Sequence, residues 1–142
     1  MKNLENLEKL EKLEQMAKLA FLARERAYAP YSNFKVGVCL ESMEGNFFTG
    51  CNVENASYPV CQCAEATALG KMVSEGCLEI KTIFVVSDTP EPIWPCGSCR
   101  QQLAEFASPS ALIYSKTKSG KSAHCSFIEL IPKLFSKSIL NK

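Results

Sequence analysis

Three cysteines and one glutamate, in two short segments, are the residues of this 142-residue chain best suited to chemistry. The sequence Cys-Ala-Glu at 63–65 and the sequence Pro-Cys-Gly-Ser-Cys at 95–99 each stand at the expected start of a helix. Unpaired backbone N–H groups and the positive dipole end of a helix start favour a thiolate over a thiol. Cys96 and Cys99 lie about one helical turn apart, so that both sulfurs can point to one place.

These sulfurs suit a zinc site with an open position. If the helix after Cys63 lies beside the helix after Cys96, three thiolates converge and leave one corner of a tetrahedral zinc ion free for water. Zinc lowers the pKa of such a water from 15.7 to about 7 in favourable cases. Glu65 follows Cys63 closely enough to accept a proton there without binding the metal. The pattern therefore favours a catalytic site over a purely structural ion.

The cysteine pattern also leaves two other interpretations open. A fourth thiolate from Cys61 would close the site and make it a structural or binding module, in which Glu65 has no task. Reduced cysteines are often buried for packing alone, and an isolated C-x-x-C is frequently accidental. Packing is the interpretation that we favour for Cys39 and Cys77.

Length and composition limit the classes of protein that fit. The length and the 46% share of hydrophobic residues suit one domain with a single core. A formal net charge of +1 argues against the broad basic surface of a polynucleotide-binding protein, so we expect no nucleic-acid partner. No apolar run approaches the ~20 residues of a membrane span, and the N-terminus lacks the apolar core of a secretory signal. We therefore expect no membrane partner and a cytoplasmic protein whose eight cysteines are reduced.

Hydrophobic periodicity predicts alternating helices and strands. Helices are expected at 4–28, 63–75 and 97–107, and strands at 34–40, 47–53, 80–86 and 111–114, with a fifth strand after Gly120. Ser126 and Glu129 form an S-x-x-E capping box, which predicts a further helix start after Ser126. This order predicts an α/β fold, a three-layer α/β/α sandwich with a mixed sheet of about five strands.

The first predicted helix has an irregular apolar pattern. Its leucines at 4, 7, 10 and 13 drift by about 60° per step around the helix, so that they do not share one face. A coherent stripe begins later and consists of Leu10, Leu13, Ala17, Ala20, Phe21 and Tyr28. We assign residues 1–10 to an N-terminal helical extension and 11–142 to a single domain. Packing along an adjacent subunit and simple fraying are both open for the extension.

Five ordered blocks resemble the cytidine deaminases, specifically the small, homotetrameric, zinc-dependent type in the cytidine/deoxycytidylate deaminase superfamily. The blocks are Tyr-Ser-Asn-Phe-Lys-Val-Gly at 31–37, Gly-Cys-Asn-Val-Glu-Asn-Ala-Ser-Tyr at 50–58, Cys-Ala-Glu at 63–65, Pro-Cys-Gly-Ser-Cys-Arg-Gln at 95–101 and Leu-Ile-Pro-Lys-Leu-Phe at 130–135. The resemblance extends over residues 12–136. It implies that residues 11–142 are a cytidine deaminase-like catalytic domain.

The resemblance implies a role for each matching residue. Cys63, Cys96 and Cys99 would hold one zinc ion per subunit, and Glu65 would be the catalytic proton shuttle. The implied substrate contacts are those of Asn52 and Glu54 with the ribose hydroxyls, of Phe34 and the Ala64 backbone with the pyrimidine, and of Ala56, Tyr58 and Phe135 with a neighbouring subunit's site. From the residues alone, Asn52 and Glu54 would instead be interpreted as turn caps.

The same resemblance implies an activity. It is the hydrolytic deamination of cytidine and 2′-deoxycytidine to uridine and 2′-deoxyuridine plus ammonia, in pyrimidine salvage, by a hydrolase acting on a cyclic amidine C–N bond. The implied partners are a small pyrimidine nucleoside and the other subunits of a homotetramer. Two alternatives are a deaminase of another aminopyrimidine nucleoside, such as a nucleoside antibiotic, and a non-catalytic zinc module. The sequence has no evident basic, aromatic-rich strand, which disfavours a polynucleotide deaminase.

One position departs from the family pattern. Relatives often place an arginine directly after the glutamate, where it hydrogen-bonds the ligand thiolates, but this chain has Ala66 there. Three thiolates on Zn²⁺ leave a net negative charge, which weakens the pull of the metal on water. Helix dipoles and backbone N–H groups offset part of this charge, and Arg100 is a further candidate.

Overall fold

A computed structural model describes residues 2–140 of the chain. Its strands are β1 (Val36–Ser42), β2 (Phe47–Cys51), β3 (Ile80–Ser87), β4 (Ala107–Thr117) and β5 (Ser122–Ser126). Its helices are α1 (Lys2–Glu25), α2 (Ala64–Ser74) and α3 (Gly97–Ala104), with short 3₁₀ turns at Tyr58–Val60, Phe127–Leu130 and Lys137–Ile139. Met1 and residues 141–142, which belong to the expected extension and domain, lie outside the described residues.

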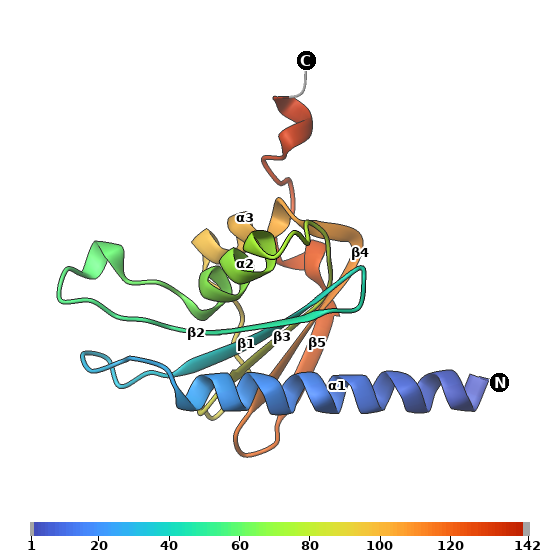
Figure 1. Cartoon of the computed structure of the whole chain (residues 1–142), viewed down its shortest axis with the longest axis horizontal. Helices are drawn as coiled ribbons and strands as arrows, with labels where there is room; N and C mark the ends of the chain where they lie inside the picture. The colour runs from blue at the N-terminus through green and yellow to red at the C-terminus, as the bar shows by residue number, and fades with distance from the viewer. Residues whose placement is uncertain (1, 141–142) are drawn as a thin grey trace.

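The strands form one mixed sheet in the order β2-β1-β3-β4-β5. Only β3 and β4 run parallel, whereas β1 is antiparallel to both of its neighbours and β5 is antiparallel to β4. Helix α1 packs on one face of the sheet, and α2 and α3 lie on the other (Figure 1). The predicted three-layer α/β/α arrangement with five strands is therefore confirmed. Within residues 2–140, no helix is both long and apolar enough to cross a bilayer.

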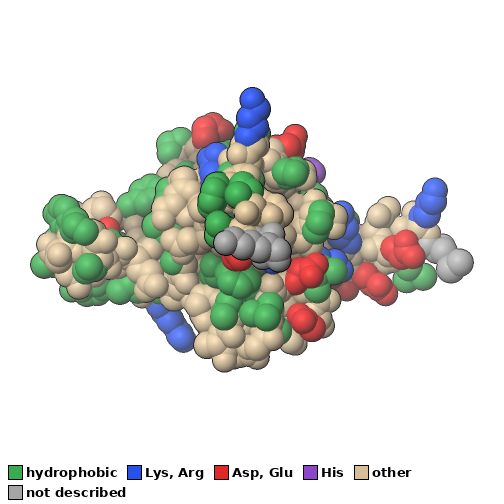
Figure 2. Space-filling model, turned by 90° about the horizontal axis from the view of Figure 1, so that it is seen from above, with side chains coloured by type: hydrophobic (Ala, Val, Ile, Leu, Met, Phe, Trp, Pro, Cys, Tyr) green, Lys and Arg blue, Asp and Glu red, His purple; other side chains and the backbone are tan. Residues whose placement is uncertain are grey.

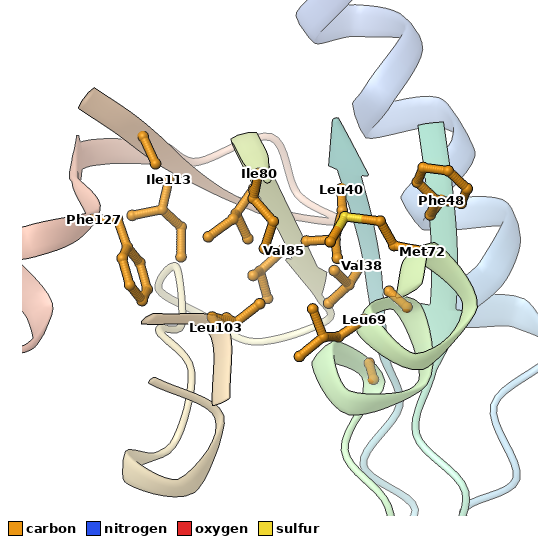
Figure 3. Close-up of a cluster of buried hydrophobic side chains, with 14 of the residues drawn as sticks. Val38, Leu40, Phe48, Leu69, Met72, Ile80, Val85, Leu103, Ile113 and Phe127 are labelled. Atoms are coloured by element: carbon orange, nitrogen blue, oxygen red, sulfur yellow. The ribbon is translucent and has the colours of Figure 1, made fainter. Parts of the chain in front are cut away.

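The larger of two apolar cores lies between the sheet and α2 and α3. Val38 and Leu40 of β1 and Val85 of β3 point into it, and Leu69 and Met72 of α2 cover them (Figure 3). These positions alternate along each strand, so that the other strand face is left for α1. The smaller core on that face is formed by Met16, Ala17, Ala20, Cys39, Phe84 and Val86.

Two glycines bring the helices close to the sheet. A Cβ on Gly50 of β2 would lie 2.4 Å from the backbone nitrogen of Ala68 in α2, too close for any side chain. A Cβ on Gly37 of β1 would lie 2.0 Å from the carbonyl oxygen of Ala20 in α1. Glycine at these two positions therefore sets how closely α1 and α2 lie on the sheet.

The predicted stripe of α1 is partly wrong. Leu10 and Tyr28 are 58% and 57% exposed, whereas Met16 and Arg24, which the stripe omitted, are buried. The face of α1 that is buried is set in part by two charged residues, which bond to β1 and to the residue before it. Arg24 Nε donates to the Lys35 carbonyl oxygen at 3.1 Å, and Lys12 pairs with the buried Glu41 of β1 at 2.8 Å.

Element boundaries also differ in places from the expectation. The strand expected at 111–114 is the middle of an eleven-residue β4, and the helix expected at 97–107 ends at Ala104. The helix expected at 4–28 begins at Lys2 and ends at Glu25. The capping box of Ser126 and Glu129 is confirmed, with Glu129 Oε2 accepting from the Ser126 N–H at 2.9 Å, but it opens a 3₁₀ turn.

We predict that alanine at Gly50 of β2 and at Gly70 of α2 changes the free energy of unfolding in opposite directions. Gly50→Ala should lower the free energy of unfolding by about 1–3 kcal/mol, because the new methyl group pushes α2 off the sheet. Gly70→Ala should raise it by about 1 kcal/mol, because Gly70 lies in α2 with open space around it. Urea denaturation of both variants measures the difference. Equal midpoints would contradict the close-contact role of Gly50.

Candidate metal centre

Three cysteine sulfurs converge at the starts of α2 and α3. The Sγ atoms of Cys63, Cys96 and Cys99 all lie within 4.8 Å of one another, and those of Cys63 and Cys96 are 4.0 Å apart. Tetrahedral zinc with Zn–S bonds of about 2.3 Å requires S···S distances of about 3.8 Å. The three sulfurs therefore fit one zinc ion with little adjustment.

The helix starts determine where these sulfurs lie. Cys63 is the N-cap of α2 and Cys96 is the N-cap of α3, both with extended backbone. Their carbonyl oxygens accept the first helical hydrogen bonds, from Thr67 N at 3.1 Å and Arg100 N at 2.9 Å. Cys99 lies in the first turn of α3 and is 1% exposed. Two positive helix ends thus face the same small volume, where they stabilise negative sulfur.

The protonation of the three thiols depends on their surroundings. Burial raises the pKa of Cys63 and Cys99, and the Glu65 carboxylate beside them raises both further. Burial pushes the pKa of Cys96 upward too, but hydrogen bonds from the backbone N–H and thiol of Cys99 outweigh it and lower that pKa. A bound cation reverses this balance, because it binds the deprotonated thiolates and releases their protons. The three thiols are therefore expected to be ionised when a metal cation is bound to them.

Glu65 lies beside the sulfurs without belonging to the group. Its side chain is 6% exposed in the first turn of α2, and its Oε2 accepts from the Cys99 thiol at 3.6 Å. Burial raises the pKa of this carboxyl, and hydrogen bonds from its own N–H and from Cys99 oppose the rise. A buried carboxyl next to a metal site is placed to accept a proton and to return it.

The four-thiolate alternative does not fit the structure. The Cys61 sulfur accepts from the Asn55 N–H at 3.3 Å and lies 3.6 Å from the Asn55 carbonyl oxygen. Among the described residues the group of possible metal ligands contains Cys63, Cys96 and Cys99 and not Cys61. The structure therefore offers three sulfur ligands here, which would leave the fourth position of a tetrahedral ion open.

Ala66 leaves space beside the cluster. A cleft of about 410 Å³ is lined by Cys61, Cys63, Ala66, Ser98, Cys99 and Gln102, among others. The Arg100 guanidinium does not turn to this cleft, since it donates to the carbonyl oxygens of Pro95 at 2.7 Å and Leu130 at 2.9 Å. Arg100 therefore holds the loop before Cys96, and the expectation that it helps to offset the charge of the thiolates gains no support.

Asn52 and Glu54 hold the loop between α1 and β1. The Asn52 amide donates to the Phe34 carbonyl oxygen at 2.7 Å and accepts from the Val36 N–H at 2.8 Å. The Glu54 carboxylate accepts from the Tyr31 and Ser32 N–H groups at 2.9 Å and 3.1 Å, and from the Ser32 hydroxyl. The Ser32 hydroxyl and N–H, followed by the Tyr31 N–H, hold the pKa of Glu54 below its ordinary value.

Both side chains retain hydrogen-bonding capacity after these contacts. An ionised carboxylate offers about four lone-pair sites and an amide NH₂ two donors, of which the loop uses three and one. Their segment also lies next to the metal cluster, because Val53 exchanges two backbone hydrogen bonds with Gln62, the residue before Cys63. A hydroxylated ligand at the cluster would therefore find donors and acceptors here.

The other predicted site residues lie in four places. Ala64 is buried at the start of α2, directly between Cys63 and Glu65, and Phe34 is 46% exposed on the loop that Asn52 holds. Ala56 and Tyr58 lie on a loop that extends beyond β2, and Phe135 on a C-terminal segment that leaves the body elsewhere (Figure 1). The chain thus brings the sulfurs, Glu65 and Ala64 together but leaves these two projecting segments apart.

Ser32 is a residue that the sequence analysis missed. Its hydroxyl donates to Glu54 and accepts from the Phe34 N–H at 3.0 Å, which links the two predicted site residues. A serine two residues before the Phe34 N–H in a Pro-Tyr-Ser-Asn turn is a signal for such a side-chain-to-backbone bond.

Comparisons with known proteins agree with this geometry. The family model described as "Cytidine and deoxycytidylate deaminase zinc-binding region" matches residues 10–116. A cytidine deaminase of Sporosarcina psychrophila is 44% identical over 119 residues, 84% of this chain and 88% of the relative. One of Halalkalibacterium halodurans is 43% identical over 119 residues, 84% of this chain and 90% of the relative. The crystal structure of cytidine deaminase from Burkholderia pseudomallei is similar with a TM-score of 0.82 and 44% identity, covering 86% of this chain and 98% of that one.

We predict that substitutions of Cys61 and Cys99, which line the same cleft, differ in their effect on zinc affinity. Cys61→Ser should keep one zinc per chain, because the Cys61 sulfur bonds to Asn55. Cys99→Ser should lower zinc affinity by more than about 100-fold, since loss of even an outer hydrogen-bond partner of a ligand costs about 10–100-fold. Competition with a chromophoric chelator measures both affinities. Equal loss of zinc in the two variants would support a site with four thiolate ligands, Cys61 included.

Proposed function

The chain belongs to the cytidine and deoxycytidylate deaminase family, and we propose that the cluster of Cys63, Cys96 and Cys99 is the zinc site at which it deaminates cytidine. The reaction adds water to the pyrimidine and releases ammonia, giving uridine, and places the protein in pyrimidine salvage. We extend the substrate class to 2′-deoxycytidine. The observation that carries the proposal is the convergence of three sulfurs within 4.8 Å beside a buried glutamate.

The three sulfurs would hold a single zinc ion and leave its fourth position free. Bound there, zinc supplies a Lewis acid that makes water a nucleophile near neutral pH. The chain provides the surroundings: two helix N-termini offset the charge of the thiolates, and the Cys99 thiol is almost fully buried. Cys63 and Cys96 are exposed, so that the site is open to a ligand from the side of the cleft that Cys63 and Ala66 border.

Glu65 moves the proton in this mechanism. Its carboxylate accepts a proton from the water that attacks ring C4 and delivers it to ring N3. It then accepts the proton of the new C4 hydroxyl and passes it to the amine as the C4–N bond breaks, so that cytidine and water become uridine and ammonia. The buried Glu65 carboxylate lies 3.6 Å from the Cys99 sulfur. This position supports the role, because the proton acceptor must lie within hydrogen-bond reach of a water molecule bound beside the sulfurs.

We assign nucleoside recognition to the segments beside the cluster. Asn52 and Glu54 bind the ribose hydroxyls with the capacity that the loop leaves unused. Phe34 packs on the pyrimidine, and the Ala64 backbone contacts its polar edge. Support comes from the hydrogen bonds that fix the Phe34 loop to Asn52 and join the Asn52 segment to the residue before Cys63.

We further propose a cytoplasmic homotetramer whose sites are shared between subunits. Ala56, Tyr58 and Phe135 would reach into a neighbouring subunit's site. Tyr58 and Phe135 are 67% and 59% exposed, so that both rings are accessible to another subunit. The loop of Tyr58 carries hydrophobic side chains and projects from the body at the left of Figure 2. The eight free thiols support the cytoplasmic location.

We predict that the proton carrier can be removed without losing the metal. Glu65→Gln should lower kcat by at least about 10²–10⁴-fold, because the amide cannot accept the proton, while zinc content stays at one per chain. Loss of absorbance in the cytidine band measures turnover, and elemental analysis of the same sample measures zinc. Glu75→Gln, an exposed change at the other end of α2, is the matched control. Normal turnover by Glu65→Gln would refute the assignment.

We predict that Glu54 contributes more to cytidine binding than Ser32, which bonds to Glu54 from the loop before β1. Glu54→Ala should raise KM for cytidine about tenfold or more, because a hydrogen bond to a charged group is worth about 1.5–3 kcal/mol. Ser32→Ala removes one loop bond to the same carboxylate and should change KM much less. Steady-state kinetics with both variants separate the two roles. Equal KM values would show that Glu54 acts only by holding the loop.

A further inference from the structure

A groove lies between the first half of α1 and the outer face of β4 and β5. Helix α1 packs on β1, β2 and β3, and its residues 2–11 are exposed, so that the outer face of the last two strands is left largely open (Figure 1). The groove has a volume of about 600 Å³, within the range of about 300–1,000 Å³ that is usual for small-molecule sites. It shares no lining residue with the metal cluster, which lies on the opposite face of the sheet.

The helix side of the groove is mostly aliphatic. The residues of α1 that face it are Asn6, Leu10, Leu13 and Ala17. At about 100° per residue these four positions fall within an arc of about 60°, so that they form one continuous strip along the helix. Leu10 is 58% exposed and Leu13 is half-buried, so that both leave apolar surface uncovered in the groove.

The sheet side of the groove is a row of three rings. Phe84, Tyr114 and His124 occupy directly paired positions on β3, β4 and β5. The ring centroids of neighbours are 5.8 Å and 5.1 Å apart, and the ring planes are inclined by only 12° and 19°. Phe84 is buried in the smaller core, whereas His124 on the edge strand is exposed. The row therefore runs from the core beneath α1 to the edge of the sheet and offers aromatic surface along the groove.

Charged groups border the groove with an excess of positive charge. Lys9 and Lys116 are among its lining residues, together with a single acid, Glu14. Within residues 2–140, neither of these lysines forms an ion pair. Lys116 follows Tyr114 by two positions on β4, so that both side chains lie on the same face of the sheet. A ligand with one negative group can therefore pair with a lysine beside the rings, whereas further negative charge would meet Glu14.

We propose that this groove binds a small planar aromatic molecule that carries one negatively charged group. Its ring system lies between Leu10 and Leu13 on one side and the rings of Tyr114 and His124 on the other, where it removes apolar surface on both sides from water. Its negative group pairs with Lys116. The site lies on the face of the sheet away from the metal cluster, so it goes beyond the proposed deamination and does not depend on it.

Fluorescence titration of the full-length, zinc-loaded protein with anilinonaphthalene sulfonate tests the proposal. This dye joins a flat aromatic ring system to one sulfonate group, and its fluorescence rises in apolar surroundings. It should bind saturably, with one molecule per chain. Leu10→Gln should raise the dissociation constant about fivefold or more, because the helix side of the groove loses a leucine, while glutamine keeps nearly the same helix propensity. Leu22→Gln is the matched control, since Leu22 is 57% exposed on the same helix and does not line the groove.

A second dye tests the requirement for a negative group. Phenylnaphthylamine has the same rings without the sulfonate. Lys116→Gln should raise the dissociation constant of the sulfonate dye about two- to fivefold, the size expected of a solvent-accessible ion pair, and should leave that of phenylnaphthylamine unchanged. Lys118→Gln is the matched control, since Lys118 is exposed directly after β4 and does not line the groove.

The outcomes separate this site from other causes of dye binding. Weaker binding to Leu10→Gln and Lys116→Gln, with unchanged binding to the two controls, would support the proposal. Absence of saturable binding would overturn it and leave the groove to a protein partner. Equal weakening by Leu10→Gln and Leu22→Gln would also overturn it, because it would mark nonspecific adhesion of the dye along α1. A sulfonate dye that binds Lys116→Gln with unchanged affinity would overturn the assigned class of ligand.

Cytidine distinguishes this site from the metal cluster. Excess cytidine should leave dye binding unchanged, because the groove and the cluster lie on opposite faces of the sheet. Displacement of the dye by cytidine would overturn the proposal, since it would place the dye at the cluster. Turnover of cytidine, measured on the same samples without dye, tests the proposed function separately.

Discussion

The close approach of α2 to the sheet at Gly50 is the contact on which the metal cluster depends. A single added carbon at Gly50 would lie 2.4 Å from the backbone of α2. The start of α2 carries Cys63 and Glu65, so the depth of this contact fixes both groups relative to α3. Leu69 and Met72 of the same helix fill the core between it and the sheet. Backbone contact and side-chain packing thus act together, because neither alone determines a helix position to within the fraction of an ångström that a metal site requires.

The electrostatics of the cluster follow from this placement. Two helix N-termini and three thiols lie together, with Cys99 buried and Cys63 and Cys96 exposed. The buried Glu65 adds a further acid, and its presence raises the pKa of the neighbouring thiols. Such a group of acids is poorly stable as anions by itself and is well matched to a divalent cation. The same packing that buries Cys99 also buries Glu65 beside it, with the Glu65 carboxylate 3.6 Å from the Cys99 sulfur.

Much of this could be predicted from the sequence, and the failures have physical reasons. The spacing of Cys96 and Cys99 on one helical turn is local, and the prediction that Cys63 joins them required only that two helices lie side by side. The buried face of α1 was harder, because Met16 and Arg24 are chosen by where the sheet lies and not by apolar periodicity. Arg100 contacts the carbonyl oxygens of Pro95 and Leu130. These contacts depend on the path of separate loops, so no local sequence pattern predicts them.

The sulfur cluster and the exposed first turns of α1 lie on opposite faces of the sheet. All sulfur ligands lie with α2 and α3 on one face, and α1 packs on the other face through its second half alone. The Lys12–Glu41 ion pair marks the boundary, since the helix is packed on the sheet after it and exposed before it. The exposed first turns of α1 therefore lie apart from Cys63 and Glu65, which belong to the start of a helix on the opposite face of the sheet.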